Sequence, residues 1–331
     1  MSIRSGLAAQ LGAASETTWG TAVTPDHFYE FLSEDINLKV ERLESKGLRS
    51  NNRVLRTDRW AATQQRIEGK IDLEVPTKGM SLWIKQALGS TTVSTPSGAT
   101  LARLHRSVLG DPYGLGLTVQ VGRPDSAGTV QPFTYAGCKV DQLSLMNGVG
   151  DFLKAEMNIV GKSETTGTGL ATAVYPITGG AASFAYLNWT QGAITIAGSP
   201  VGVVTDIKID INNNIKSDRY FLGAATMSEP IIAAMTEISG SVTVEFDGLT
   251  SYNRFVNGTV AALTATWTGA TAIESTTYPA VLVNLPNVRF DGDTPNVKGP
   301  DVITHDLKFK VLYDGSTGPI TIDQTTTDTA V

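Results

Sequence analysis

The chain contains two similar segments in which 33 positions separate an isoleucine from a glycine: Ile36 from Gly69, and Ile207 from Gly240. Alternating apolar residues begin each segment, in DINLKV for the first and DIKIDI for the second. A second alternating run starts at each glycine, GKIDLEV in one segment and GSVTVEF in the other. Alternation of this kind is typical of strands that bury one face. The sequence therefore predicts a β-domain that occurs twice.

Further matches follow both segments. A weakly amphipathic helix is predicted after each, in GMSLWIKQAL from Gly79 and in TSYNRFVNG from Thr250. Three later pairs of strands correspond: LTVQVG with LTATWTG, CKVDQLSL with PNVRF, and DFLKAEMNIVGK with DVITHDLKFKVLYDG. The spacing falls from 171 to about 146–150 positions here, which we attribute to a Ser/Thr/Gly-rich insertion near residues 89–110. The first helix is expected to cap an open end of its domain with the apolar stripe Met80, Trp83, Ile84, Ala87 and Leu88.

The length of 331 residues suits two domains of ordinary size. Abundant Thr, Val, Ile and Gly with few helical runs favour an all-β class. We predict two tandem β-sandwich domains, each with a short flanking α-helix and a long loop or hairpin arm. The predicted parts are an N-terminal arm (1–24), a first sandwich (25–162), a linker (163–182), a second sandwich (183–316) and a C-terminal tail (317–331).

Two segments of more than 20 residues lack a clear strand pattern, 44–66 and 214–237, and they occupy equivalent positions in the two copies. Irregular segments of this length are uncommon in compact domains, so we interpret them as arms that reach beyond each sandwich. Residues 41–66 carry a net charge of +4, whereas residues 212–237 carry −1. This asymmetry would suit contacts between neighbouring copies, and a solvated loop without a partner is the alternative. The candidate contact residues are Arg49, Arg53, Arg56, Arg59, Trp60, Tyr220 and Phe221.

The residues that usually carry catalysis or bind metals form no constellation in the sequence. The three histidines are far apart, and there is no HExxH, CxxC, nucleophile elbow or phosphate-binding glycine loop with a lysine. Cys138 is expected to be a small buried filler, and the acidic loop 291–301 a polar turn instead of a calcium site. We therefore expect no enzyme, no cofactor and no metal site.

No apolar run is long enough to span a bilayer, and the N-terminus lacks the apolar core of a secretory signal. We expect a chain without a membrane segment that stays in the cytoplasm until it is assembled or released.

The segment ETTWGTAVTPDHFYEFLSEDINLKVERLESKGLRSNNR (Glu16–Arg53), with the strand and the Trp83 helix that follow, resembles the tail tube proteins of long-tailed bacteriophages. The second half is similar to the same family in the run from Trp189, in TDIKIDINNNIK and in ISGSVTVEF. The resemblance covers roughly Glu16–Asp314. It implies β-sandwich domains with a flanking helix, in which a long loop clasps neighbouring subunits.

Members of this family form rings that stack into a hollow tube through which the genome passes. The resemblance therefore implies a structural protein of the virion tail, made in the host cytoplasm. The implied partners are other copies of the chain, a tape-measure protein in the lumen, tail terminator and distal tail or baseplate proteins, and double-stranded DNA in transit. Because single-domain members are typically hexameric, a duplicated chain is expected to form a homotrimer with pseudo-sixfold symmetry.

The wet faces of the predicted strands are candidates for the wall of such a lumen. Asp72 and Glu74 alternate with apolar residues in the first copy, and Glu245 does so in the second. An acidic wall would repel phosphate and keep DNA from adhering. The alternative function is a tandem β-sandwich module on the virion that binds a receptor or a carbohydrate, for which a groove lined by exposed aromatic residues is expected.

Overall fold

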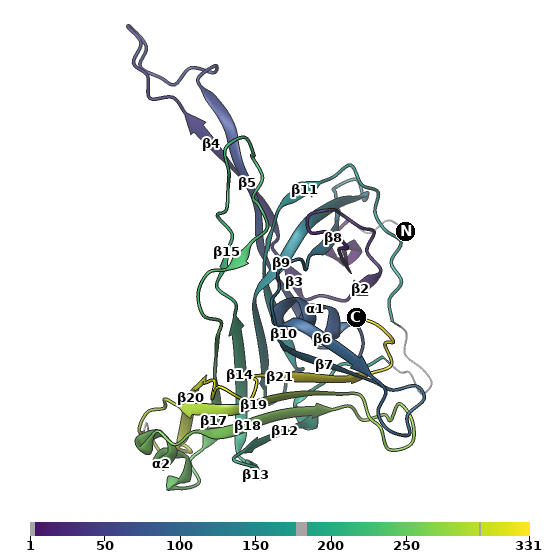
Figure 1. The fold of residues 1–331 in the computed structure, drawn as a ribbon, viewed down its shortest axis with the longest axis vertical. Coiled ribbons are helices and arrows are strands. Elements are labelled where there is room, and N and C mark those ends of the chain that lie inside the picture. The colour runs from purple at the N-terminus through teal and green to yellow at the C-terminus, as the bar shows by residue number, and fades with distance from the viewer. Residues whose placement is uncertain (1–3, 177–183, 298) are drawn as a thin grey trace.

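The computed structural model describes residues 4–176, 184–297 and 299–331, and it consists mainly of antiparallel strands (Figure 1). The predicted all-β class is confirmed. The first half contains a 3-10 turn (Gly6–Ala8), β1 (Gln10–Ser15), β2 (His27–Tyr29), β3 (Ser33–Glu34), β4 (Asn37–Glu44), β5 (Trp60–Glu74), α1 (Met80–Leu88), β6 (Gly89–Ser94), β7 (Arg103–Leu109), β8 (Leu117–Pro124), β9 (Val130–Gly148), β10 (Lys154–Gly161) and β11 (Ser163–Thr165).

The second half begins with a 3-10 turn (Trp189–Gln191). It continues through β12 (Gly192–Ile196), β13 (Ser199–Pro200), β14 (Val204–Asn212), β15 (Ile215–Lys216), β16 (Ile231–Ile232), β17 (Glu237–Glu245), α2 (Leu249–Asn257), β18 (Ala261–Thr268), β19 (Ala280–Phe290), β20 (Thr304–Val311) and β21 (Thr321–Thr326).

One sheet runs through both halves in the order β4–β5–β10–β9–β14–β17–β20. Its central junction is the antiparallel pairing of β9 with β14, where Leu145 faces Ile209. One face of this sheet is apolar and packs into a core that both halves share, as the burial of Ile71, Ile209 and Leu307 shows. The other face is polar.

The two halves have the same order of strand pairing, β4–β5–β10–β9 in the first and β14–β17–β20–β19 in the second. Their registers also correspond, because Ile159 faces Gly69 in one half and Phe309 faces Gly240 in the other.

Three of the sequence alignments between the halves are out of register by two residues. The first strands are one case, because Gly69 lies against Ile36 whereas Gly240 faces Ile209 and not Ile207. β8 bulges between Leu117 and Val119 against β9, and β18 has the matching bulge between Ala261 and Leu263 against β19. Leu117 therefore corresponds to Ala261 and not to Leu263, and Cys138, which faces Leu117, corresponds to Val288. A shift of two residues preserves which side chains are buried, so alternation cannot reveal it.

The two helices differ in their surroundings. Every residue of α1 except Lys85 is buried, because the helix packs against β9, β6 and β7 (Figure 1). The expectation that its apolar stripe caps an open end is wrong, since the helix lies inside the core. α2 has no fully buried residue.

Several segments outside the two predicted sandwiches take part in the sheets. Leu11 and Ala13 of β1, in the expected N-terminal arm, are buried where β1 pairs with β8. The insertion of the first copy is the β6–β7 hairpin, and β7 pairs with β21 from the expected C-terminal tail. In the expected linker, β11 pairs with β9, and residues 177–182 lie outside the described residues. These strands contain small or polar residues, so they lack the apolar alternation by which a strand is recognised in a sequence. The division into domains stays a prediction.

Candidate assembly surfaces

The polar face of the long sheet crosses from the first half into the second. One straight row of cross-strand neighbours contains Asp72, Glu156, Ser144, Asp210, Ser239 and Lys310. Paired residues in an antiparallel sheet point to the same side, so these six side chains share one face.

The three residues proposed for a lumen lie on this face. Asp72 is bridged by Lys70 at 3.4 Å, and the same lysine lies 3.1 Å from Glu156. Glu74 faces Lys154 across the β5–β10 pair, and Glu245 is exposed opposite Thr304. The structure thus brings Asp72, Glu74 and Glu245 onto one surface, although they come from different halves.

The face is mixed in sign, with an acidic excess. Its paired strand positions hold nine carboxylates, six lysines and one arginine. The carboxylates are Glu68, Asp72, Glu74, Glu156, Asp206, Asp210, Glu237, Glu245 and Asp306, and the basic residues are Lys39, Arg66, Lys70, Lys154, Lys208, Lys308 and Lys310. Burial, with the charge of Asp306 as a second cause, raises the pKa of Asp206. The sequence analysis proposed three of these carboxylates, Asp72, Glu74 and Glu245, and not the other charged residues of the face.

Both ends of the long sheet have strand edges without a partner in the described part of the chain. β4 pairs with β5 on one side only. At the other end, β20 pairs with β17 from Thr304 to Lys310 but with β19 only from Phe309 to Val311. Unpaired edges of this kind are sites where another chain can add strands.

The hairpin of β4 and β5 projects from the body, and residues 45–59 at its tip are named the first arm (Figure 1). Arg49, Arg53, Arg56 and Arg59 all lie on it. Asp58 accepts two hydrogen bonds from Arg56, at 3.0 and 3.2 Å, and lies 3.4 Å from Arg59. The Arg56 hydrogen bonds lower the pKa of Asp58.

Apolar side chains on and beside the first arm face solvent. Trp60 is 50% exposed, with the Arg42 guanidinium carbon 6.0 Å from its ring centroid. Leu48 and Val54 are also exposed. The first arm therefore exposes an unusual amount of apolar surface at the end of a projecting hairpin.

Residues 213–236, the second arm, take a different course. They run back along β5: the Gln65 amide donates to the Ala225 carbonyl at 2.8 Å, and the Tyr220 hydroxyl donates to the Gln65 carbonyl at 3.1 Å. Phe221 is 61% exposed. Tyr220 therefore forms a hydrogen bond within its own chain, whereas the Phe221 side chain faces solvent.

A buried ion pair fixes the second arm to the first half. Lys139 of β9 is 2% exposed, and its Nζ lies 2.8 Å from Glu229. The ammonium also donates to the carbonyl oxygens of Pro112 and Leu115, at 2.6 and 2.8 Å. Burial lowers the pKa of Lys139, and Glu229 opposes this effect. The sequence interpretation missed this pair, for which the only signal was a lysine in the otherwise apolar run around Cys138.

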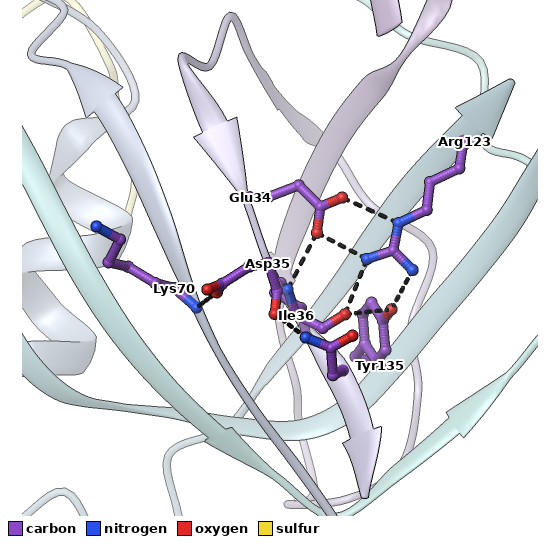
Figure 2. A network of polar contacts seen from close by, with 7 residues as sticks. Glu34, Asp35, Ile36, Lys70, Arg123 and Tyr135 are labelled. Atoms are coloured by element: carbon purple, nitrogen blue, oxygen red, sulfur yellow. Dashed lines mark hydrogen bonds and ion pairs between the residues drawn. The ribbon is translucent and has the colours of Figure 1, made fainter.

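A polar network holds the start of β4 (Figure 2). Arg123 donates to both carboxylate oxygens of Glu34, at 2.9 and 2.7 Å, and to the Ile36 carbonyl at 2.8 Å. The Tyr135 hydroxyl donates to the same carbonyl at 3.1 Å, and the Lys70 amide donates to Asp35. β4 is therefore held at its root although its outer edge is unpaired.

A comparison with protein families identifies this fold. The family model described as "Phage tail tube protein" matches residues 6–311. The chain belongs to the phage tail tube protein family. A search among curated proteins returned no similar sequence.

Membership of the tail tube family gives the general role of the chain. The chain is a structural protein of the phage tail, and the family implies assembly of its copies into a tube. In the described part of this tail tube protein, no helix has the length and apolar content needed to cross a membrane.

One pocket of the tail tube protein lies at the end of β5. Its lining includes the carboxylates Asp26, Glu30, Glu74 and Asp328 and the aromatic residues Tyr175, Phe184 and Tyr186. The Tyr186 hydroxyl donates to Glu30 at 2.5 Å, and burial raises the pKa of Tyr186. Aromatic side chains of the kind expected for a carbohydrate site are thus present together, beside four carboxylates.

The titratable residues expected to be inert have structural contacts in the tail tube protein. His105 and His305 are buried and bond to the backbone carbonyls of Asp328 and Asp293, each at 2.8 Å. Cys138 is fully buried, which raises the pKa of its thiol. Among the residues that the structure describes, no group of three or more His, Cys, Asp or Glu could hold a metal ion.

Proposed function

We propose that three copies of the chain form a ring, that rings stack into the tail tube, and that the tube is the conduit for genome ejection. The observation that carries this proposal is the β9–β14 pairing, which joins the two halves laterally. It leaves β4 unpaired at one end of the sheet and part of β20 unpaired at the other. A head-to-tail contact between two different edges closes into a ring when its rotation permits.

The equivalent pairing orders of the two halves support an internal duplication. Each half would then occupy one of six similar positions, and three chains would supply all six. The halves have diverged, since α1 is buried and α2 is not, and the second arm is docked while the first arm projects. Divergence is expected when two copies alternate around a ring.

We assign the polar face of the long sheet to the lumen. Its acidic excess would weaken the attraction between the wall and DNA phosphates, because phosphate binding depends on cationic side chains. The lysines among these carboxylates reduce the negative charge of the face but leave it acidic overall. The lumen would also hold a tape-measure protein before ejection.

The proposed partners beyond the ring follow from the same role. The ends of the tube would contact a tail terminator and distal tail or baseplate proteins, after synthesis in the host cytoplasm. The fold serves assembly in this scheme, and we propose no enzymatic activity.

Cryo-electron microscopy of assembled tubes tests the proposal. We expect rings of three chains, with threefold averaging that resolves α1 and α2 at alternating positions. Six chains per ring would contradict the trimer. A chain that stays monomeric at high concentration and in assembling tails, and binds a glycan in the pocket beside Glu74, would support the receptor-binding alternative.

A further inference from the structure

The docking of the second arm inside the chain provides a template for the docking of the first arm between chains. Gly69 lies against Ile36 and Gly240 faces Ile209, so the two halves correspond at a spacing of 173 positions in β4 and β14 and of 171 positions in β5 and β17. Counted back from these glycines, Glu229 of the second arm and Asp58 of the first both lie eleven residues earlier and therefore correspond. Both residues are acidic.

The surface that receives the second arm also has a counterpart. Lys139 faces Val160 in the β9–β10 pair, and Arg289 faces Lys310 in the β19–β20 pair. Because Ile159 and Phe309 occupy equivalent registers, Lys139 corresponds to Arg289. Both residues are basic.

The neighbouring carboxylates correspond as well. In the first half, Asp141 accepts a hydrogen bond from the Ile215 amide, at the root of the second arm, at 2.8 Å. Its counterpart is Asp291, two residues after Arg289. In the isolated chain, Arg289 and Asp291 bond to each other instead, at 2.8 and 2.7 Å. In the first half, Lys139 and Asp141 each hold a residue of the second arm, whereas in the second half Arg289 and Asp291 hold each other.

We propose that Asp58 of one copy forms an ion pair with Arg289 of a neighbouring copy, in the way that Glu229 pairs with Lys139 within the chain. Asp291 then accepts a hydrogen bond from the amide of the neighbour's Arg42, which corresponds to Ile215 in the register of β4 and β14. The contact must form between chains because the first arm and β19 lie at opposite ends of the molecule (Figure 1). It rests on the proposed assembly into rings.

The charges of the free surfaces support this pairing. Asp58 is about half exposed on the first arm, and Arg289 is 43% exposed on β19. Their present partners, Arg56, Arg59 and Asp291, are themselves exposed, so exchanging them costs little. In the assembly, the pair would be shielded as Lys139 and Glu229 are.

Disulfide trapping in tubes tests the contact directly. Asp58→Cys and Arg289→Cys are placed in separate chains, mixed, assembled and oxidised, and Cys138 does not interfere because it is fully buried. We expect a covalent heterodimer from the mixture and none from either variant alone. The matched control combines Asp58→Cys with Arg254→Cys on α2, for which no heterodimer is expected. Tubes that form normally but give no heterodimer, or as much as the control, would overturn the pairing alone.

Charge reversal provides a second measurement. Asp58→Lys and Arg289→Glu should each raise the concentration needed for assembly by about tenfold or more, and their combination should restore most of the loss. Asp218→Lys on the second arm is the control and should assemble normally. Single reversals that assemble like the unmodified chain would refute the ion pair. Failure of the unmodified chain to form tubes would overturn the proposed function as well.

Discussion

Gly69 of β5 lies so close to Ile36 that a Cβ atom at this glycine would overlap the Ile36 Cα and come within 2.6 Å of the Asp35 carbonyl oxygen. Gly240 has the same relation to β14, where a Cβ would collide with the Lys208 carbonyl oxygen. The glycine that marks each repeat in the sequence is therefore the point where the first two strands of each half, which pair antiparallel, approach too closely for a side chain. Any side chain here would separate the two strands.

We predict that Gly69→Ala destabilises the protein by about 2 kcal/mol or more, because backbone atoms instead of flexible side chains must move. Urea unfolding measures the effect. Gly47→Ala on the first arm is the control, since its nearest neighbour would be Ser45 Oγ at 3.4 Å. Equal stabilities of the two variants would contradict the close approach.

Strands with strict alternation and the stripe of α1 could be predicted from the sequence, because burial alternates with a fixed period. β7 and β21 could not be paired, since His105 and Gln324 face each other across more than 200 residues of chain. Both arms could be located in the sequence because they lack apolar alternation. The sequence did not predict that the first arm projects from the body while the second runs back along β5. The second arm is docked through contacts between residues far apart in the sequence, among them the buried pair of Lys139 with Glu229 from the other half.

The Lys139–Glu229 pair should be essential for the position of the second arm. Glu229→Ala leaves a buried ammonium without its counter-ion, and we expect a loss of about 3 kcal/mol in urea unfolding. Replacing both residues, as in Lys139→Met with Glu229→Leu, should recover most of this stability. Asp218→Ala, which removes an exposed ion pair with Lys216, should change stability by less than about 0.5 kcal/mol. A similar small effect of Glu229→Ala would show that the arm is held by other contacts.

Glu274 ties the loop before β7 to the second half. Its carboxylate accepts hydrogen bonds from the amides of Thr100, Leu101 and Ala102 at 2.7–2.9 Å, and from the Thr100 hydroxyl at 2.8 Å. These bonds, led by the one from the Ala102 amide, lower the pKa of Glu274 from 4.5 to about 2. Folding therefore favours the ionised form.

A group with a depressed pKa stabilises the fold above its unfolded pKa, and the contribution is lost as the pH falls through the folded pKa. Glu274→Gln should thus lower the urea midpoint at pH 6, and the difference from the unmodified protein should shrink from about pH 4.5 and vanish near pH 2. The comparison between the two proteins cancels other titrating groups. A difference independent of pH would assign the effect to packing.

Removing the tip of the first arm should separate folding from assembly. Deletion of 45–65 would also remove part of β5 and Gln65, which holds the second arm, so a shorter deletion of residues 46–58 with a Gly-Ser turn is the better test. We expect an unchanged melting temperature and circular dichroism spectrum, but no tubes in electron micrographs. Tubes of normal length from this variant would remove the arm from the assembly scheme.

The assignment of the polar face to the lumen predicts an effect on DNA passage. Asp72 is best left in place, because it is bonded to Ser33 as well as to Lys70. Glu74→Lys combined with Glu245→Lys changes the charge of the face by four per chain without removing that pair. We expect tubes to form and DNA release from reconstituted virions to slow, because a cationic wall binds phosphate. The delay should diminish as the salt concentration rises, since screening weakens this attraction. Release at the normal rate at low salt, from virions that contain only the variant, would place this face away from the DNA.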